Sequence, residues 1–389
     1  MDRSYDVVIA GGAAMGSSLA YHLAADTGFK GRVLVVEKDF TYAKAATSLS
    51  LSSIRQQFSQ SLNIRVGLAG MAFLRNARQT LAVDGDGPDL PVVENGYLYL
   101  ATDPEALRAN HAVQIAEGAD VALLSPDQLK AQFPWLNVEG VALGSFGRSG
   151  EGWFDSYTLM QAFRRKATSL GATYVQDEVV GFKRDGARVT GARLAQGGEI
   201  GCGAFVNCAG ASGAARLAAA LGTPIPVEAR KRCVFVFEAR QIDKFPLLID
   251  PSGVYVRPEG RHYLIGGPPP DPDPDTQDFE VDWPMFEEAL WPVLAARVPA
   301  FESLKLVRAW AGHYDLNIFD HNALVGRLPG LDNAYLAAGF SGHGVQQSPA
   351  VGRGLAELIV HGGYRTLDLG DFAFERIAAG RPMRERNVI

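Results

Sequence analysis

Residues 5–38 read YDVVIAGGAAMGSSLAYHLAADTGFKGRVLVVEK, and this stretch decides the fold. A short apolar run at residues 7–10 is rich in β-branched side chains and stops at Gly11 and Gly12, as a buried parallel strand does. Leucines and alanines then recur at helical spacing as far as Gly28, and a second apolar run at residues 33–36 ends at Glu37. This order of elements predicts a βαβ unit that holds a dinucleotide.

Each part of the unit has a chemical reason. Gly11 permits the tight turn, Gly16 lets the helix lie close to the strand, and the helix N-terminus offers N–H groups to an anionic pyrophosphate. Glu37 lies about 20 residues beyond Gly16, where its carboxylate can accept hydrogen bonds from ribose hydroxyls. The middle glycine of the usual fingerprint is Ala13 here, whose methyl group crowds the pyrophosphate position. An α/β unit without a ligand is the alternative interpretation.

Composition narrows the class of protein. The chain has 389 residues, of which 47% are hydrophobic, so we expect a large core and two domains. A net charge of −6 argues against nucleic acid as a partner, and no apolar run is long enough for a transmembrane segment. The first strand begins too early for a signal peptide, so a cytoplasmic location is expected. Cys202, Cys208 and Cys233 lack metal-ligand spacing, and we expect reduced thiols and no metal site.

Strand and helix signals indicate that a second sheet interrupts the first. Residues 41–58 are rich in small and hydroxylated side chains and are expected to form a loop that covers a cofactor, whereas residues 268–275, PPPDPDPD, are expected to form an exposed extended loop. Helices are predicted at 64–81 and 157–170, and strands at 92–101, 173–176, 179–182, 188–194, 204–207, 233–237, 253–257 and 262–266. We predict an α/β fold with a Rossmann-like dinucleotide domain (1–85, 150–220 and 305–389) and a smaller α+β domain with an antiparallel or mixed sheet (86–149 and 221–304).

A second glycine turn lies in the last third of the chain. A strand predicted at 333–338 is followed by GFSGHG at residues 339–344 and by a helix predicted at 349–361. Such a turn again presents backbone N–H groups to negative charge. Two turns of this kind suit a two-ended ligand, with a pyrophosphate at one end and a ring system that develops charge at the other.

Three motifs carry a resemblance to a known family. GGAAMG, FVNCAGA and AAGFSGHGVQQSPAVGRGLAELI, in this order, resemble the D-amino acid oxidase superfamily of FAD-dependent amine oxidoreductases, over essentially the whole chain. Within it, LSSIRQQFS, EGWFD and WAGHYDLNIFDHNALVG are similar to a mitochondrial FAD oxidoreductase associated with respiratory complex I assembly and to bacterial relatives such as iminodiacetate oxidase. The resemblance implies a sarcosine oxidase-like fold in which FAD spans the dinucleotide domain and the other domain binds the substrate.

The resemblance also implies the residues that contact FAD. The ADP half would be bound by Gly11, Gly12, Ala14, Met15, Gly16, Glu37 and Lys38, with Val179 at the adenine and Cys208 and Gly210 near the pyrophosphate. The flavin would be lined by Thr47, Ser48, Leu51, Ser52, Gly312, Gly342, His343, Gly344, Val345 and Gln346. A helix N-terminus at the second glycine turn would stabilise negative charge on the reduced ring.

Three positions depart from sarcosine oxidase. In that enzyme a cysteine two residues before a tyrosine tethers the flavin; the matching pair here is Gly312 and Tyr314, so we predict noncovalent FAD. Gln346 stands where a carboxylate-binding lysine follows the glycine turn, and an apolar residue near Leu264 replaces the lysine credited with oxygen activation. These replacements leave both the substrate contacts and the oxidase reaction open.

Five residues are predicted to serve the substrate: Arg55, Tyr255, Arg257, His313 and Tyr314. The resemblance places a carboxylate-binding arginine at Arg55, where two parallel hydrogen bonds can hold the carboxylate, and a surface salt bridge is the alternative. Tyr255 and Arg257 alternate along one strand and would share a face, which is either the flavin side or an ordinary sheet face. Of the neighbours His313 and Tyr314, only one is expected to reach the substrate. The basic residues 230–232 favour a solvated strand edge, with Arg232 as the member that could face inward.

We therefore predict FAD-dependent oxidation of a secondary or N-substituted amino acid, such as iminodiacetate or sarcosine. Hydride transfer to flavin N5 would give an imine, which hydrolyses to an amine and a carbonyl product, and O2 would reoxidise the flavin with formation of H2O2. A dehydrogenase with another electron acceptor, or a flavin-containing assembly or binding factor, is the alternative. A nicotinamide dehydrogenase would not explain the second glycine turn.

Overall fold

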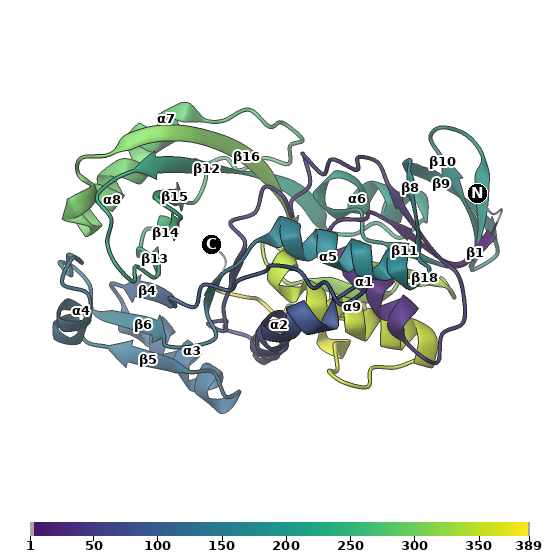
Figure 1. The fold of residues 1–389 in the computed structure, drawn as a ribbon, viewed down its shortest axis with the longest axis horizontal. Coiled ribbons are helices and arrows are strands. Elements are labelled where there is room, and N and C mark those ends of the chain that lie inside the picture. The colour runs from purple at the N-terminus through teal and green to yellow at the C-terminus, as the bar shows by residue number, and fades with distance from the viewer. Residues whose placement is uncertain (1–3, 388–389) are drawn as a thin grey trace.

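The computed structural model describes residues 4–387, which form two eight-stranded sheets with helices packed around them. The first sheet lies on the right of Figure 1, and the second lies on the left. The predicted α/β class with a Rossmann-like sheet and a second, mixed sheet is confirmed. The predicted domain limits stay a prediction, and their ends at residues 1–3 and 388–389 lie outside the described part.

The first sheet is built around β1 (Ser4–Ala10), which pairs in parallel with its neighbours on both sides. Its order is β17–β18–β11–β1–β2–β8, and the hairpin β9–β10 is attached to β11. The other bounds are β2 (Val33–Glu37), β8 (Thr173–Gln176), β9 (Val179–Asp185), β10 (Arg188–Leu194), β11 (Glu199–Asn207), β17 (Leu324–Arg327) and β18 (Ala334–Ala338). Because β1, β2, β11 and β18 run in parallel, the turns that follow them meet at one edge of the sheet.

Alternation along β1 supplies both faces of the first sheet. Val7 and Ile9 pack under the helices α1 (Ala14–Ala25), α2 (Ser61–Thr80), α5 (Ser156–Ser169) and α9 (Gly344–His361). Val8 and Ala10 face α6 (Gly210–Ala220) and the β9–β10 hairpin. These side chains are almost fully buried, and burial of each Val or Ile contributes about 1.5–3 kcal/mol.

The second sheet has the order β16–β12–β15–β14–β13–β4–β6–β5. Its strands are β4 (Tyr97–Ala101), β5 (Val121–Leu124), β6 (Leu143–Gly147), β12 (Val227–Glu238), β13 (Leu247–Ile249), β14 (Tyr255–Glu259), β15 (His262–Gly266) and β16 (Lys305–Asn317). Its helices are α3 (Pro104–Ala116), α4 (Pro126–Gln132), α7 (Trp283–Met285), a π-helical turn (Phe286–Leu290) and α8 (Trp291–Arg297). The short pair β3 (Ser53–Ile54) and β7 (Gly152–Trp153) stands apart from both sheets.

Side chains that alternate along β12 lie on two different faces of the second sheet, one in its core and one toward the first sheet. Phe235 and Phe237 pack into a core with α8, whereas Val234 and Val236 contact Leu264 and the loop around Leu51. The long strands β12 and β16 arch over the top of Figure 1 and reach the part that contains α6. The face of β12 that carries Val234 is therefore the one that can meet a cofactor on the first sheet.

Three elements differ from the sequence prediction. Strand β16, which falls in the range 305–389 of the predicted dinucleotide domain, pairs with β12 along the second sheet, and the chain returns to the first sheet at β17. Helix α3, capped by Asp103, was not predicted. Helix α9 begins at Gly344 rather than at 349. Pro349 has no N–H to donate to the Val345 carbonyl, and Ser348 Oγ donates to that carbonyl instead, at 2.9 Å, so the helix can continue through the proline.

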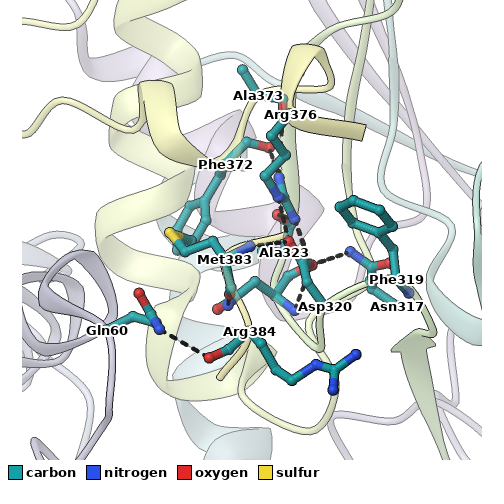
Figure 2. A network of polar contacts seen from close by, with 12 residues as sticks. Gln60, Asn317, Phe319, Asp320, Ala323, Phe372, Ala373, Arg376, Met383 and Arg384 are labelled. Atoms are coloured by element: carbon teal, nitrogen blue, oxygen red, sulfur yellow. Dashed lines mark hydrogen bonds and ion pairs between the residues drawn. The ribbon is translucent and has the colours of Figure 1, made fainter. Parts of the chain in front are cut away.

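A buried carboxylate anchors the C-terminal segment. Arg376, on α10 (Glu375–Ala378), donates to both oxygens of Asp320 at 2.7 and 3.0 Å, and the Met383 N–H donates to the same carboxylate at 3.0 Å (Figure 2). Farther along, Gln60 donates to the Arg384 carbonyl at 2.9 Å (Figure 2). The segment is thereby held against the start of α2, close to the loop that contains Arg55.

Candidate functional site

A cavity of about 580 Å³ lies where the two sheets meet. It extends from the ends of β1 and β2 to the walls formed by β12, β14 and β16. Seventeen of the predicted site residues line it: Gly11, Ala14, Met15, Glu37, Lys38, Thr47, Leu51, Val179, Cys208, Gly210, Tyr255, Gly312, His313, Tyr314, Gly342, Gly344 and Val345. Gly12, Gly16, Ser48, Ser52, Arg55, Arg257, His343 and Gln346 are not part of the lining.

The first glycine turn has the close packing expected of a dinucleotide site. Gly11 has a φ of +94°, and a side chain on it would come within 2.3 Å of the Cys208 carbonyl oxygen. A Cβ on Gly16 would lie 1.9 Å from the Gly11 oxygen, so this glycine is required for the approach of α1 to β1. No side chain caps α1 and no acid occupies its first turn, and its N-terminus is therefore electropositive.

Glu37 lines the cavity and retains capacity to accept hydrogen bonds. Its two oxygens accept the Gly12 N–H at 2.7 Å and the Asp39 N–H at 3.0 Å. Each carboxylate oxygen has two acceptor sites, so one site on each remains for a ribose hydroxyl. Nearby, Lys38 donates to Ser212 at 2.9 Å, and a side chain on Gly210 would meet no protein atom within 4 Å.

The second glycine turn closes the other end of the cavity. Gly342 has a φ of +91°, and a Cβ there would lie 2.7 Å from the Tyr314 ring. Helix α9 starts at Gly344 without a side-chain cap or an acidic first turn. The sequence prediction of two electropositive helix starts at one cavity agrees with this geometry.

The loop 41–58 forms the wall between the two turns. Thr47 accepts the Ala14 N–H at 3.3 Å, while Ser52, outside the lining, donates to Ser156 at 2.6 Å. The buried hydroxyl of Ser48 has no hydrogen-bond partner in the described part of the chain, as expected where a ligand completes the site. A Cβ on Gly312 would lie 2.9 Å from Leu49, so the loop fills the place of a tethering side chain. These residues fit a dinucleotide, and the loop and β16 would hold its ring system.

Arg55 does not reach the cavity lining. Its side chain is buried and donates to the carbonyls of Gln57, at 2.8 Å, and of Asn387, and it contacts His343 Nε2 at 2.9 Å. Burial lowers the pKa of His343, with the Arg55 charge acting in the same direction, so the imidazole is neutral. Gln346 accepts the Arg55 N–H at 2.9 Å. The guanidinium that the sequence assigned to a substrate carboxylate is thus held by the chain itself.

Arg257 has a similar position. It donates to the Leu51 carbonyl through Nε at 3.0 Å and through a terminal nitrogen at 2.6 Å, and it pairs with Glu259. Its guanidinium lies 5.5 Å from the Trp153 ring. The strand does place Tyr255 on the cavity, but Arg257 fixes the covering loop and does not line the cavity.

Tyr314 and His313 lie on opposite faces of β16. Tyr314 shares its face with Gly312 and lies beside the second glycine turn, and burial raises the pKa of the phenol. His313 packs edge-on against Phe279 at 4.4 Å, its Nε2 has no partner in the described residues, and burial lowers its pKa. Burial also raises the pKa of Tyr255 well above its ordinary value. The cavity wall therefore offers two neutral phenols.

The sequence prediction did not include Arg232 among the site residues. Register places it opposite Gly312 on β16, and its guanidinium lies 5.2 Å from the Tyr314 ring. It lines the cavity. The only sequence signal for this position was strand alternation in the basic residues 230–232. Alternation predicts that residues 230 and 232 share one face of the strand and that residue 231 lies on the other.

Some classes of site are absent from residues 4–387. This part of the chain contains no cluster of His, Cys, Asp and Glu that could hold a metal ion. The same residues include no helix with the length and apolar character needed to cross a membrane. The three cysteines are free and buried, and burial raises the pKa of each thiol.

Comparisons with known proteins identify FAD-dependent oxidoreductases, which is consistent with a dinucleotide in this cavity. The model of the family DAO, FAD dependent oxidoreductase, matches residues 6–358. FAD-dependent oxidoreductase domain-containing protein 1 of Xenopus laevis is 44% identical over 422 aligned residues, which cover 99% of this chain and 85% of that protein.

Two solved structures have the same fold. L-proline dehydrogenase from P. horikoshii has a TM-score of 0.87 at 28% identity and covers 98% of this chain and 100% of that one. Glycine oxidase from Geobacillus kaustophilus has a TM-score of 0.82 at 25% identity, with 96% and 98% covered. The resemblance inferred from the sequence is confirmed, FAD is the cofactor, and the chain belongs to the DAO family of FAD-dependent oxidoreductases.

Proposed function

We propose that this oxidoreductase acts on a secondary or N-substituted amino acid of the sarcosine type. The chemistry that FAD supplies when bound is acceptance of a hydride from the carbon beside the donor nitrogen, after which the imine hydrolyses to an amine and a carbonyl compound. The observation that carries the proposal is the cavity wall that Tyr255 and Tyr314 line, with Tyr314 beside the second glycine turn. The names of the two similar solved enzymes, which refer to proline and glycine, support an amino-acid donor, and proline is a secondary amine.

The residues of this wall can orient such a donor. The two phenols are neutral, so they can donate to a carboxylate or accept from an amine N–H. Val234 and the buried Leu264 make the neighbouring surface apolar, which excludes water from the reacting carbon. Orientation of this kind is the main contribution that the protein makes to the rate.

The donor nitrogen must be unprotonated when its neighbouring carbon loses the hydride. His313 was a candidate to take that proton, and it lines the cavity as Tyr314 does, but from the other face of β16, where its ring packs against Phe279. We therefore expect the amine to bind in its neutral form, with the proton released to solvent beforehand. The rate of flavin reduction should then rise with pH toward the pKa of the free amine.

An anaerobic titration tests the proposal. Sarcosine, iminodiacetate, other N-substituted glycines and proline should include a donor that bleaches the flavin absorbance, and primary amines without a carboxylate should not. A spectrum that stays unchanged with the whole panel would contradict the proposal and favour a binding or assembly role.

The electron acceptor follows from a second step of the same experiment. We infer that O2 reoxidises the reduced flavin, with H2O2 as the product, and air should then restore the absorbance. The specific observation that favours the dehydrogenase alternative is that Leu264, near the position of the lysine credited with oxygen activation in sarcosine oxidase, lies in an apolar cluster with Val234 and Val236. Slow recovery in air and fast recovery with an artificial acceptor would select that alternative. The cytoplasmic location likewise stays a prediction.

A further inference from the structure

Arg232 is the cation on the substrate side of the cavity, and a carboxylate already occupies it. Its two terminal nitrogens donate to the two oxygens of Asp273 at 3.0 and 2.9 Å. The other cations of the described lining, Lys38, Lys44 and Arg216, come from the cofactor-covering loop and the dinucleotide end. The fork of Arg232 therefore holds a carboxylate in the parallel geometry that an amino-acid carboxylate would adopt.

Asp273 belongs to the proline-rich segment 268–279, which lies along a free edge of β12. Strand β15 pairs with β12 at residues 235–237, so the earlier part of β12 has no partner strand on that side. The segment fills the gap: Asp275 accepts the Ala229 N–H at 2.8 Å, and Thr276 donates to the Ala229 carbonyl at 2.9 Å. Farther along, Phe279 lines the cavity. The segment thus forms part of the wall of the substrate end, while Asp273 lines a neighbouring pocket that shares Arg232 with the main cavity.

The contacts of this wall are suited to exchange. Prolines at alternate positions deprive the segment of N–H donors, so it has little internal hydrogen bonding. The side chain of Asp273 is 29% exposed, so water can replace its hydrogen bonds when it leaves Arg232. A donor carboxylate that replaces Asp273 would restore the same two hydrogen bonds on Arg232. The exchange is therefore one carboxylate for another.

Arg55 and Arg257, which the sequence assigned to the substrate, are held by partners that a substrate carboxylate could not replace. The partners of Arg55 and Arg257 include backbone carbonyls of Gln57, Asn387 and Leu51, which cannot leave without movement of the main chain. A substrate carboxylate at either guanidinium would have to displace those carbonyls. Arg232 has one such contact, to the carbonyl of its neighbour Lys231, and it keeps that contact while Asp273 leaves.

We propose that Arg232 binds the carboxylate of the amino-acid donor and that Asp273 occupies this position in its absence, so that donor binding releases the segment 268–279. This inference rests on the proposed function for the identity of the ligand. It makes Arg232 a substrate-binding residue and Asp273 its internal competitor.

The test uses methoxyacetate, which has the shape of sarcosine but carries an ether oxygen that cannot be oxidised as an amine. Binding to the flavin-loaded protein is followed by the change in flavin absorbance and by calorimetry. R232M should raise the Kd by about 30- to 100-fold, and R232K, which keeps the charge but loses the fork, by about 10-fold. D273N should lower the Kd by about 3- to 10-fold, because it weakens the competitor.

The matched control is K231M. Lys231 is the next residue on β12, it pairs with Asp278 of the same segment, and it does not line the main cavity. Its loss should not raise the Kd of methoxyacetate, and none of the variants should alter the weak binding of neutral methoxyacetamide. Hydrogen exchange in residues 268–279 should increase when methoxyacetate binds.

Two results would overturn the inference: equal effects of R232M and K231M on the Kd, or weaker binding in D273N. If R232M loses its flavin, D273N still decides the question, because tighter binding of methoxyacetate is expected for that variant. The proposed function fails separately, because methoxyacetate binding is read without any reaction. A protein that binds methoxyacetate through Arg232 but is reduced by no amine would keep this inference and lose the other.

Discussion

Substitution of Glu151 by glutamine should make the protein less sensitive to pH. Glu151 is fully buried, and its carboxylate accepts the backbone N–H groups of Gln56 at 2.6 Å and Gln57 at 3.0 Å, as well as the Gln57 amide at 2.8 Å. Burial raises the pKa of this carboxyl from 4.5 to about 7, and its hydrogen bonds and the nearby Arg55 charge oppose the shift. The ionised form is therefore costly in the folded protein.

The magnitude follows from the two pKa values. A carboxyl that binds its proton more tightly in the folded state stabilises the fold below the unfolded pKa of 4.5, and this contribution is lost as the pH rises through about 7. Between pH 5 and pH 8 the loss amounts to about 2.5 kcal/mol. For a chain of this length that corresponds to about 3 °C in the unfolding temperature.

Thermal unfolding of the flavin-loaded protein at pH 5, 6, 7 and 8 measures the effect. E151Q should gain about 2.5 kcal/mol relative to the wild type from pH 5 to pH 8, with most of the change between pH 5 and pH 7. The histidines that are neutral in the fold, such as His343, lose stability in the opposite direction below their ordinary pKa, but they are common to both proteins. E139Q, the same change at an exposed position, should run parallel to the wild type. Parallel curves for E151Q as well would refute the reasoning.

Three further outcomes are expected. Heat or acid should release all of the FAD into the supernatant, because position 312 is a glycine, and flavin on the denatured chain would contradict noncovalent binding. D320N should destabilise the protein by about 3–5 kcal/mol, since it breaks a buried ion pair, whereas D120N at an exposed pair should cost less than about 1 kcal/mol, as measured by unfolding. G342A should reduce the flavin content about tenfold, because its Cβ meets an aromatic ring of the wall; G380A has the same type of backbone conformation with open space around it and should retain FAD.

Local patterns explain which parts of the fold were predictable. The βαβ unit and the second glycine turn are each formed by one continuous stretch of sequence. The backbone at Gly11 and Gly342 has a positive φ, which favours glycine, so the sequence shows a glycine at each of these positions. The pairing of β16 with β12 was not predictable, because the two strands are distant in the chain and neither segment carries a sequence pattern that identifies its partner. The alternation of β12 did carry a signal for Arg232, but it did not say which face was inside.

The functions of the arginines were less predictable, because they depend on partners that lie far away in the sequence. Arg55 has a residue type and a position that suit a substrate carboxylate, yet its guanidinium donates to Asn387, at the other end of the chain. No pattern around residue 55 reveals that contact. The same holds for Arg257, whose acceptor is the carbonyl of Leu51 in the cofactor-covering loop.

Removal of the residues after 382 distinguishes Arg232 from Arg55 as the site that binds the carboxylate. The truncation deletes Glu385, whose buried carboxylate accepts from Ser59 and Asn63, and we expect a loss of about 3 kcal/mol in the free energy of unfolding. Arg55 would lose the Asn387 carbonyl but keep Gln57 and His343, and it would remain outside the cavity lining. The Kd of methoxyacetate should therefore stay within about twofold of the wild type, while R232M raises it in the truncated protein as in the complete one. A truncated protein that binds methoxyacetate about tenfold more tightly would instead make Arg55 the carboxylate site and the C-terminal segment its internal competitor.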